Sequence, residues 1–333
     1  MALFKKKDGA GPRQSRLFFA TDVHGSERTF RKFLNCAKFY KVDHIIMGGD
    51  IMGKFLVPIV HEHDSHYRVT LQGTTETIEG TDALAAIKER IETLGFYHVT
   101  VQEDELHAMQ ADQTQIDAKF RQLARERIER WIALADERLE GTNVKWYVTG
   151  GNDDQPEVLT VFDEVPSEHV VNCEGRVVMV DDLYPTANCG YSNPTPWDTP
   201  REVDEDRLEE ILEDAVQGVE DFTSAIFNFH VPPYDCTLDD CPKLDWSTDP
   251  PSPIVVAGVA QSAPAGSTAV RKVIEKYKPL LTLTGHIHES RGLVTIGRTT
   301  VINPGSEYGE GIIRGCIFTL RPGKVVGYQM TSG

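Results

Sequence analysis

Short apolar segments that end in metal-binding side chains are the feature that most constrains this sequence. Five such segments, each of strand length, alternate with stretches of helical pattern, and this rhythm indicates an α/β fold. The residues that follow the five segments are, in order, Asp22 and His24, Asp50, Asn152, His230, and the pair His286 and His288. Strands of an open α/β sheet present their carboxyl ends at one edge. We therefore expect these seven side chains to meet in space.

The chemistry of these side chains suits transition metals. Imidazole nitrogens and carboxylates bind Mn, Fe, Zn, Co or Ni, and Asn supplies a neutral carbonyl oxygen. Four His, two Asp and one Asn are too many for one first-row metal, but two metals that share a carboxylate would use them all. Taken singly, each element has an ordinary structural explanation, such as a turn cap for Asp50 or a loop histidine for His230. The ordered set is what points to a dimetal site.

The same residues form a series of short motifs. In chain order these are Asp22-x-His24, Gly49-Asp50, Gly151-Asn152, a single His230, and Gly285-His286-x-His288. This series resembles the calcineurin-like metallophosphoesterase family over roughly residues 17–310. The resemblance implies a four-layer αββα sandwich, an α/β fold that some schemes class as α+β, with two divalent metal ions whose identity (Mn, Fe, Zn, Ni or Co) stays open. It also implies a division of ligands, with one metal on Asp22, His24 and His288, the other on Asn152, His230 and His286, and Asp50 bridging the two.

The activity that the resemblance implies is metal-dependent hydrolysis of a phosphoric ester. A hydroxide between the metals would attack a small phosphate ester, with a phosphodiester or nucleotide-like substrate preferred. Many members of the family carry a His after the Asn, where this chain has Asp153. An ordinary Asp, with a pKa of about 3.9, is ionised at neutral pH and is a poor acid. Asp153 is a candidate catalytic residue if its pKa is raised; alternatively, Asp153 and Asp154 orient Asn152 or a ligand histidine.

An insertion interrupts the resemblance after Asp50. Alternating residues predict a hairpin over 55–71, and helical spacing predicts helices over 81–94 and 111–139, the second with an apolar stripe that we expect to pack against the body. We expect a disordered leader over 1–15 and a metallophosphoesterase domain over 16–330, with 54–142 inserted as a mostly helical cap.

Loops and a downstream turn complete the expected architecture. Residues 184–200 and 231–253 are rich in turn-forming residues, so we expect long loops there. Tyr191 and Trp197, in the first loop, either stack on a substrate base or pack beneath the cap. Residues 303–306 (Asn-Pro-Gly-Ser) resemble a turn often found in the family, and we expect a structural role for them.

The composition of the chain limits the partners that it can bind and the compartment in which we expect it. The chain has 333 residues, and its net charge of −17 argues against nonspecific binding of nucleic acid. No apolar run approaches the roughly 20 residues that span a bilayer, no signal peptide is evident, and the six cysteines are scattered, so we expect reduced thiols and a cytoplasmic location. Neither the Cys236-x4-Cys241 pair nor the His-rich tract 61–66, which we expect at a hairpin tip, predicts a second metal site.

The expected partner is a small phosphate ester, with no membrane partner and no nucleic acid, and a homo-oligomer stays open. Two other functions compete with the enzyme on a small substrate. One is a non-catalytic interaction module on the same fold, and the other is a nuclease. The presence of a matching residue at all seven ligand positions argues against the first, and the net charge argues against the second.

Overall fold

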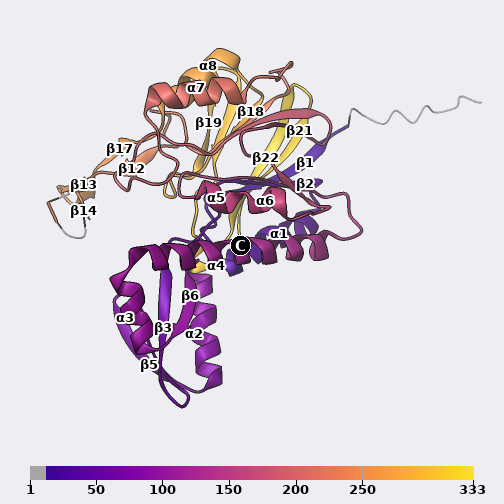
Figure 1. The fold of residues 1–333 in the computed structure, drawn as a ribbon. Coiled ribbons are helices and arrows are strands. Elements are labelled where there is room, and N and C mark those ends of the chain that lie inside the picture. Colours follow the sequence, from indigo (N-terminus) through magenta and orange to yellow (C-terminus); the bar gives the residue numbers. More distant parts are fainter. Residues whose placement is uncertain (1–12, 246, 249–250) are drawn as a thin grey trace, which may run out of the picture.

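Two six-stranded sheets stack face to face, with helices on both outer faces (Figure 1). The structure is a computed structural model that describes residues 13–245, 247–248 and 251–333. The first sheet has the order β22 (Lys324–Ser332), β21 (Arg314–Arg321), β1 (Ser15–Ala20), β2 (His44–Gly48), β7 (Trp146–Thr149) and β8 (Val170–Asn172). The second has the order β19 (Gly292–Ile296), β20 (Thr299–Asn303), β18 (Leu281–Leu283), β11 (Ile226–Phe229), β10 (Tyr184–Cys189) and β9 (Val177–Val180).

Three hydrophobic cores separate the four layers. On β1, Phe18 contributes to the core that the first sheet shares with its helices, while Phe19 contributes to the core between the sheets. The helices over the first sheet are α1 (Glu27–Tyr40), α4 (Gln113–Leu139), α5 (Pro156–Leu159) and α6 (Val161–Glu164). The third core lies beneath α7 (Glu205–Ala215) and α8 (Thr268–Tyr277), which cover the second sheet. The predicted αββα sandwich is therefore confirmed.

Parallel pairing places the key strand ends at one edge. In the first sheet β1, β2 and β7 run parallel, and in the second β10, β11 and β18 run parallel. The pairing of β1 and β2 continues past the strands, because the backbone N–H groups of Asp22 and His24 donate to the carbonyls of Gly49 and Asp50 at 3.0 and 2.9 Å. The loops that carry the predicted ligands are thus bonded to one another.

The inserted segment forms a small sheet with helices, below the body in Figure 1. The expected hairpin, β3 (Leu56–His63) and β4 (His66–Leu71), forms. It lies within a four-stranded sheet that also contains β5 (Thr74–Glu79) and β6 (Tyr97–Val101), two strands that the sequence did not predict. The helices are α2 (Thr81–Thr93), α3 (Glu103–Ala111) and the start of α4. A separate core, with Ile59 and Ile91 fully buried, holds β3, β4 and α2 together.

Helix α4 belongs to both parts. Its second half packs into the core of the body, where Trp131 stacks on Phe30 with ring centroids 3.9 Å apart, as its apolar stripe predicted. The limits 54–142 for the cap therefore stay a proposal, with α4 as the shared element. Most of the expected leader, residues 1–12, lies outside the described residues, and β1 begins at Ser15, inside the range expected for the leader.

The insertion meets the loop after β1 at a junction of glycines. A Cβ on Gly95, which has φ +83°, would lie 2.0 Å from the carbonyl oxygen of His24, and a Cβ on Gly53 would lie 2.0 Å from that of Gly95. No other residue type allows such close backbone approach. Arg127 of α4, only 2% exposed, closes the junction by donating to the carbonyls of Gly25 and Phe96 at 2.7 and 3.0 Å.

Two expected loops are partly wrong. Residues 184–189 form β10, an inner strand of the second sheet, instead of the start of a loop. Its polar Thr186 and Asn188 are buried, and Asn188 accepts a hydrogen bond from Asn228 at 2.9 Å, so the strand lacks the apolar pattern that would have revealed it. Proline in the strand hides it further.

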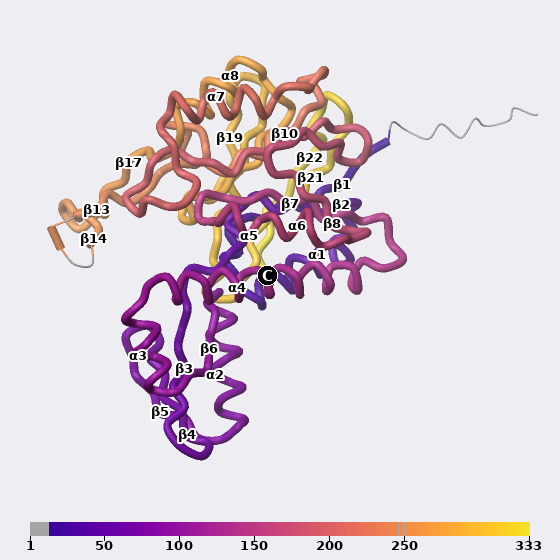
Figure 2. Tube along the Cα trace, viewed as in Figure 1, coloured from indigo at the N-terminus to yellow at the C-terminus, as the bar shows by residue number. Residues whose placement is uncertain are grey.

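The second expected loop, 231–253, contains the first strands of a projecting arm, at the left of Figure 2. The short strands of the arm are β12 (Asp240–Pro242), β13 (Leu244–Asp245), β14 (Ser252–Pro253), β15 (Val255–Val256), β16 (Val259–Ala260) and β17 (Ser262–Pro264).

Among the residues that the structure describes, no helix has both the length and the apolarity that crossing a bilayer requires.

Candidate metal centre

The seven side chains that sequence predicted do meet, at the common edge of the two sheets. Asp22, His24 and His288 form one group whose potential ligand atoms all lie within 4.8 Å of one another, and Asp50, His230 and His286 form a second. Asn152 joins the second group, because its Oδ1 lies 2.7 Å from Nδ1 of His286. These groups can hold metal ions; the role of each residue as a ligand stays a prediction.

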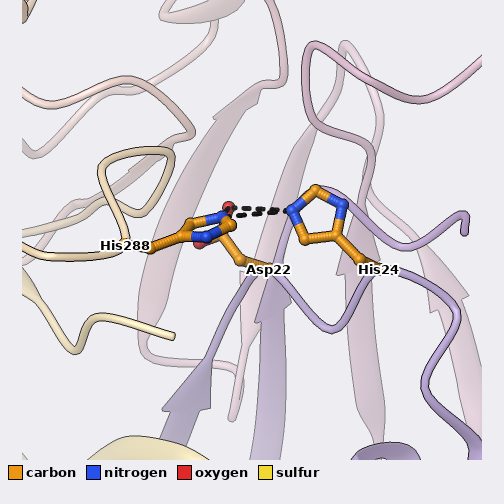
Figure 3. Close-up of side chains that lie close together, drawn as sticks. All are labelled: Asp22, His24 and His288. Atoms are coloured by element: carbon orange, nitrogen blue, oxygen red, sulfur yellow. Dashed lines mark hydrogen bonds and ion pairs between the residues drawn. The ribbon is translucent and has the colours of Figure 1, made fainter. Parts of the chain in front are cut away.

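The first group draws on both sheets (Figure 3). Nε2 of His24 lies 3.1 Å from Nε2 of His288, and Oδ1 of Asp22 lies 3.4 Å from the same His288 nitrogen. Asp22 and His24 follow β1, whereas His288 comes from the loop after β18. Two ring nitrogens and a carboxylate oxygen thus face one point, which is an arrangement that a cation would stabilise.

Asp50, a member of the second group, also lies close to the first. Its Oδ2 is 3.5 Å from Nε2 of His24 in the first group and 3.4 Å from Nε2 of His230 in the second. The other oxygen, Oδ1, accepts the backbone N–H of Asp153 at 3.0 Å, which fixes the carboxylate plane. This is the position that a bridging ligand would need.

The hydrogen bonds around the site fit metal ligation. Nδ1 of His230 lies 2.9 Å from the carbonyl oxygen of Gly48, so Nδ1 carries a proton, and a bound cation would displace the proton of Nε2 and take its lone pair. That Nε2 is buried without a hydrogen-bond partner. The amide nitrogen of Asn152 donates to Oγ1 of Thr199 at 2.8 Å, which leaves its oxygen facing the ligand cluster. The donor atoms present therefore suit one or more divalent cations.

The backbone of the site is strained. Asp22, His24, Asp50 and His286 have φ of +53°, +40°, +49° and +66°, values in the left-handed region that side chains disfavour. Such conformations persist only where the surroundings enforce them, and they concentrate at functional sites. The neighbouring glycines permit this crowding, because a Cβ on Gly151 would lie 2.1 Å from Oδ1 of Asp50. The repeated Gly-Gly before Asp50 and Asn152 thus has a packing reason.

The buried charges hold one another in place. Burial raises the pKa of Asp22, but the hydrogen bond and charge of His288 outweigh it and bring the pKa down to about 2. Burial would lower the pKa of His230, but the carboxylate of Asp50 raises it to about 10. Burial, together with the charge of His230, lowers the pKa of His286 to about 4. The cluster needs positive charge opposite its carboxylates, which bound cations would also supply.

Asp154 clamps two of the site loops together. It is fully buried and accepts the backbone N–H groups of Met52 and Gly151, each at 2.7 Å, and that of Ile51 at 3.0 Å. One carboxylate therefore joins the loop after β2 to the loop after β7. Asp154 thus contacts the backbone beside Asp50 and Asn152, and the role expected for the Asp153–Asp154 pair in orienting Asn152 or a ligand histidine stays a prediction.

Asp153 and its neighbours lie at the partly exposed side of the site. Its Oδ2 lies 2.7 Å from Nζ of Lys54 and 3.6 Å from Nδ1 of His24. Burial and the charge of Asp50 raise the pKa of Asp153 to about 6, although Lys54 opposes this. Tyr308 packs on His24 with ring centroids 4.6 Å apart. Sequence analysis missed Lys54 and Tyr308, since neither belongs to a recognisable motif.

The 303–306 turn holds two ligand loops. Nδ2 of Asn303 donates to the carbonyls of Gly285 and Ile287 at 3.1 and 2.8 Å, and Oγ of Ser306 donates to the carbonyl of Asp22 at 2.7 Å. The expected structural role is therefore confirmed. Among the described residues, the groups of three or more His, Cys, Asp or Glu that could hold a metal ion all lie at this one site, and the six cysteines are free.

Known proteins resemble the chain mainly in fold. TT1561 of Thermus thermophilus gives a TM-score of 0.53 at 15% identity, over 96% of this chain and 99% of its own. Another solved chain gives 0.57 at 14% identity over the same shares. An archaeal phosphodiesterase reaches only 0.33 at 12% identity, covering 96% of this chain and 99% of its own, and this score is too low to indicate a shared fold.

One curated protein resembles part of the sequence. An uncharacterized protein of Methanocaldococcus jannaschii is 32% identical over 156 residues, which are 46% of this chain and 61% of that protein. The match thus spans less than two thirds of the relative. No model of a known protein family matches the chain. The two solved chains with TM-scores above 0.5 share the fold of this chain, in which the Asp and His groups lie at the strand ends of the double sheet.

Proposed function

We propose that this chain is a dimetal phosphoesterase that hydrolyses a small phosphate ester, with a phosphodiester or nucleotide-like substrate preferred. The observation that carries the proposal is the pair of largely buried Asp and His groups, with Asp50 of the second group also close to His24 of the first. Two cations bound there would polarise the phosphoryl oxygens and lower the pKa of a water molecule. The calcineurin-like pattern of the seven residues supports the same reaction class.

Different residues of the chain would bind the metals, attract the substrate and donate a proton. Asp22, His24 and His288 would hold one cation, Asn152, His230 and His286 the other, and Asp50 both. Lys54, whose side chain is 36% exposed, adds a positive charge beside the site and favours an anionic substrate there. Asp153 stays the candidate proton donor to the leaving group, since its carboxyl borders the ligand cluster and remains partly accessible.

The test compares the same substitution at two places. Asp50→Asn removes the bridging charge, and we expect it to reduce hydrolysis of bis(p-nitrophenyl) phosphate about a thousandfold, because the several kcal/mol of charge stabilisation from two metals would be lost. Asp64→Asn, on the exposed turn between β3 and β4, is the matched control and should leave the rate unchanged. Chelation should abolish activity, and Mn²⁺ should restore it.

Elemental analysis completes the experiment. We expect two equivalents of metal per wild-type chain and fewer in Asp50→Asn. Full activity in purified Asp50→Asn would refute the mechanism. A chain that binds two metals but hydrolyses neither activated diesters nor monoesters would instead support the non-catalytic interaction module.

A further inference from the structure

A small apolar pocket opens directly beside the candidate metal centre. Its volume is about 180 Å³, and His286 and Ile287 form the wall that it shares with the centre. The other walls come from two separate segments, residues 194–197 with Trp197, and the arm, with Pro242, Leu244 and Pro264. Whatever occupies this pocket would lie next to any group held at the proposed metals.

The wall that carries Trp197 is a loop held in place by side-chain hydrogen bonds. Glu202 accepts hydrogen bonds from the backbone N–H and the hydroxyl of Thr195 at 2.7 and 2.5 Å, and from Thr199 at 2.6 Å. Thr199 in turn accepts from the side chain of Asn152, a proposed ligand, at 2.8 Å. The loop is therefore fixed relative to the metal centre, yet the side chain of Trp197 stays 64% exposed. An exposed tryptophan on a braced loop offers a rigid flat surface.

The opposite wall is fixed as well. Strand β12 pairs with β17, which brings Pro242 and Pro264 to the same small sheet. Oγ of Ser290 donates to the carbonyl of Asp240 at 2.6 Å and so ties the arm to the loop that follows His288. Lys243 and His286 add polar groups to the mostly apolar lining. The pocket thus joins apolar walls with two groups that can form hydrogen bonds.

We propose that this pocket binds a flat heteroaromatic ring of the substrate, such as a nucleobase, while the phosphate occupies the metal centre. This inference rests on the proposed function and names its substrate class. The volume is below the ~300 Å³ of pockets that enclose a whole drug-sized ligand, so it suits one ring system of a larger molecule. Stacking on Trp197 would favour a flat ring, and Lys243 and His286 could form hydrogen bonds with ring heteroatoms that an alkyl chain lacks.

Two ligands that differ only by the base test this proposal. Adenosine 5′-monophosphate and ribose 5-phosphate share the phosphate and the sugar, so calorimetry on the Mn²⁺-loaded full chain isolates the contribution of the ring. We expect the nucleotide to bind about tenfold more tightly. Trp197→Ala should remove most of that difference in affinity and leave the affinity for ribose 5-phosphate unchanged. Trp197→Phe should keep much of the difference. Phe39→Ala, at a 77% exposed aromatic on α1, is the control.

The outcomes separate the two proposals. Equal affinity for the two ligands, or a preference that survives Trp197→Ala, would refute the proposal that the pocket binds a ring. It would not affect the proposal that the chain is a phosphoesterase. If neither ligand binds to the metal-loaded chain, the proposed function itself fails. If octyl phosphate binds more tightly than the nucleotide, and does so through Trp197, the occupant is an alkyl chain and the heteroaromatic proposal is wrong.

Discussion

The strand-end edge of the body and the inserted cap are built on different principles. At the edge, backbone conformations are strained, glycines are crowded and polar side chains are buried, as at Asp22, Asp50 and Gly151. The cap is a regular sheet packed on α2 around its own aliphatic core. Strained backbone is found where several loops bring their side chains to one point, and regular structure is found where the chain only packs on itself.

The two regions meet beside the loop that carries His24, and this makes the comparison testable. Arg127 and the glycines 25, 53 and 95 join the cap to the loop that carries His24. If the cap only covers the site, changes at the junction should alter stability alone. If the junction also holds His24 in its left-handed conformation, the same changes should weaken metal binding.

Arg127→Met is expected to have the largest effect. The guanidinium is buried, donates to the carbonyls of Gly25 and Phe96, and lies 3.6 Å from Glu27. Removing one partner of a buried charged network costs about 3–5 kcal/mol. We expect a loss of that size in the free energy of unfolding, measured with denaturant, together with weaker Mn²⁺ binding.

Arg130→Met is the matched control for this variant. Arg130 lies one turn further along α4 and contacts the same Glu27 at 3.5 Å, but its side chain is 56% exposed. Exposed ion pairs contribute about 0–1 kcal/mol, so this variant should be nearly as stable as the wild type. Equal losses in the two variants would mean that Arg127 does not join the cap to the site.

Gly95→Ala should have an intermediate effect. Its Cβ would collide with the carbonyl oxygen of His24, and overpacking of this kind costs about 1–3 kcal/mol. Gly80→Ala separates this collision from backbone strain, because Gly80 has a similar φ of +89° but open space around its Cβ. We expect Gly95→Ala alone to lower Mn²⁺ affinity in a metal titration. If both variants bind Mn²⁺ with similar affinity, the collision at Gly95 affects the stability of the cap but not the metal site.

The sequence predicted the candidate site better than its surroundings, for a physical reason. Asp22, Asp50 and His230 each follow a buried strand, and parallel strand ends converge whatever the helices between them do. The order of the strands therefore sufficed to bring the seven side chains together. Helix α4 was also predictable, because packing on the body requires an apolar stripe.

What the sequence missed lacks such a pattern. Strand β10 contains buried Thr186 and Asn188, whose hydrogen bonds replace the usual apolar signal. Strand β5 carries exposed polar residues on an edge of the cap sheet, so it has little apolar alternation. Lys54 reaches Asp153 only because the insertion enters beside the site, and a single lysine in a sequence does not reveal that contact.

The smallest predicted effect concerns the other end of β2, where His44 lies opposite to the Asp50 end. Burial lowers the pKa of His44 despite the nearby Asp181, and Nδ1 accepts the backbone N–H of Lys145 at 3.1 Å, so the folded chain holds this imidazole neutral. The unfolded chain takes up a proton near pH 6.5. Between that pH and the lower folded pKa, the unfolded state binds more protons, and the free energy of unfolding falls as the pH falls.

His44→Gln removes this titration while an amide can still accept the bond from Lys145. We expect the metal-free wild type to lose more stability than the variant between pH 7 and pH 5, measured as the shift in denaturant midpoint. Because the proposed ligand histidines titrate in both proteins, the difference between them isolates His44. An equal or larger loss of stability in His44→Gln would show that this end of β2 tolerates a charged imidazole at position 44.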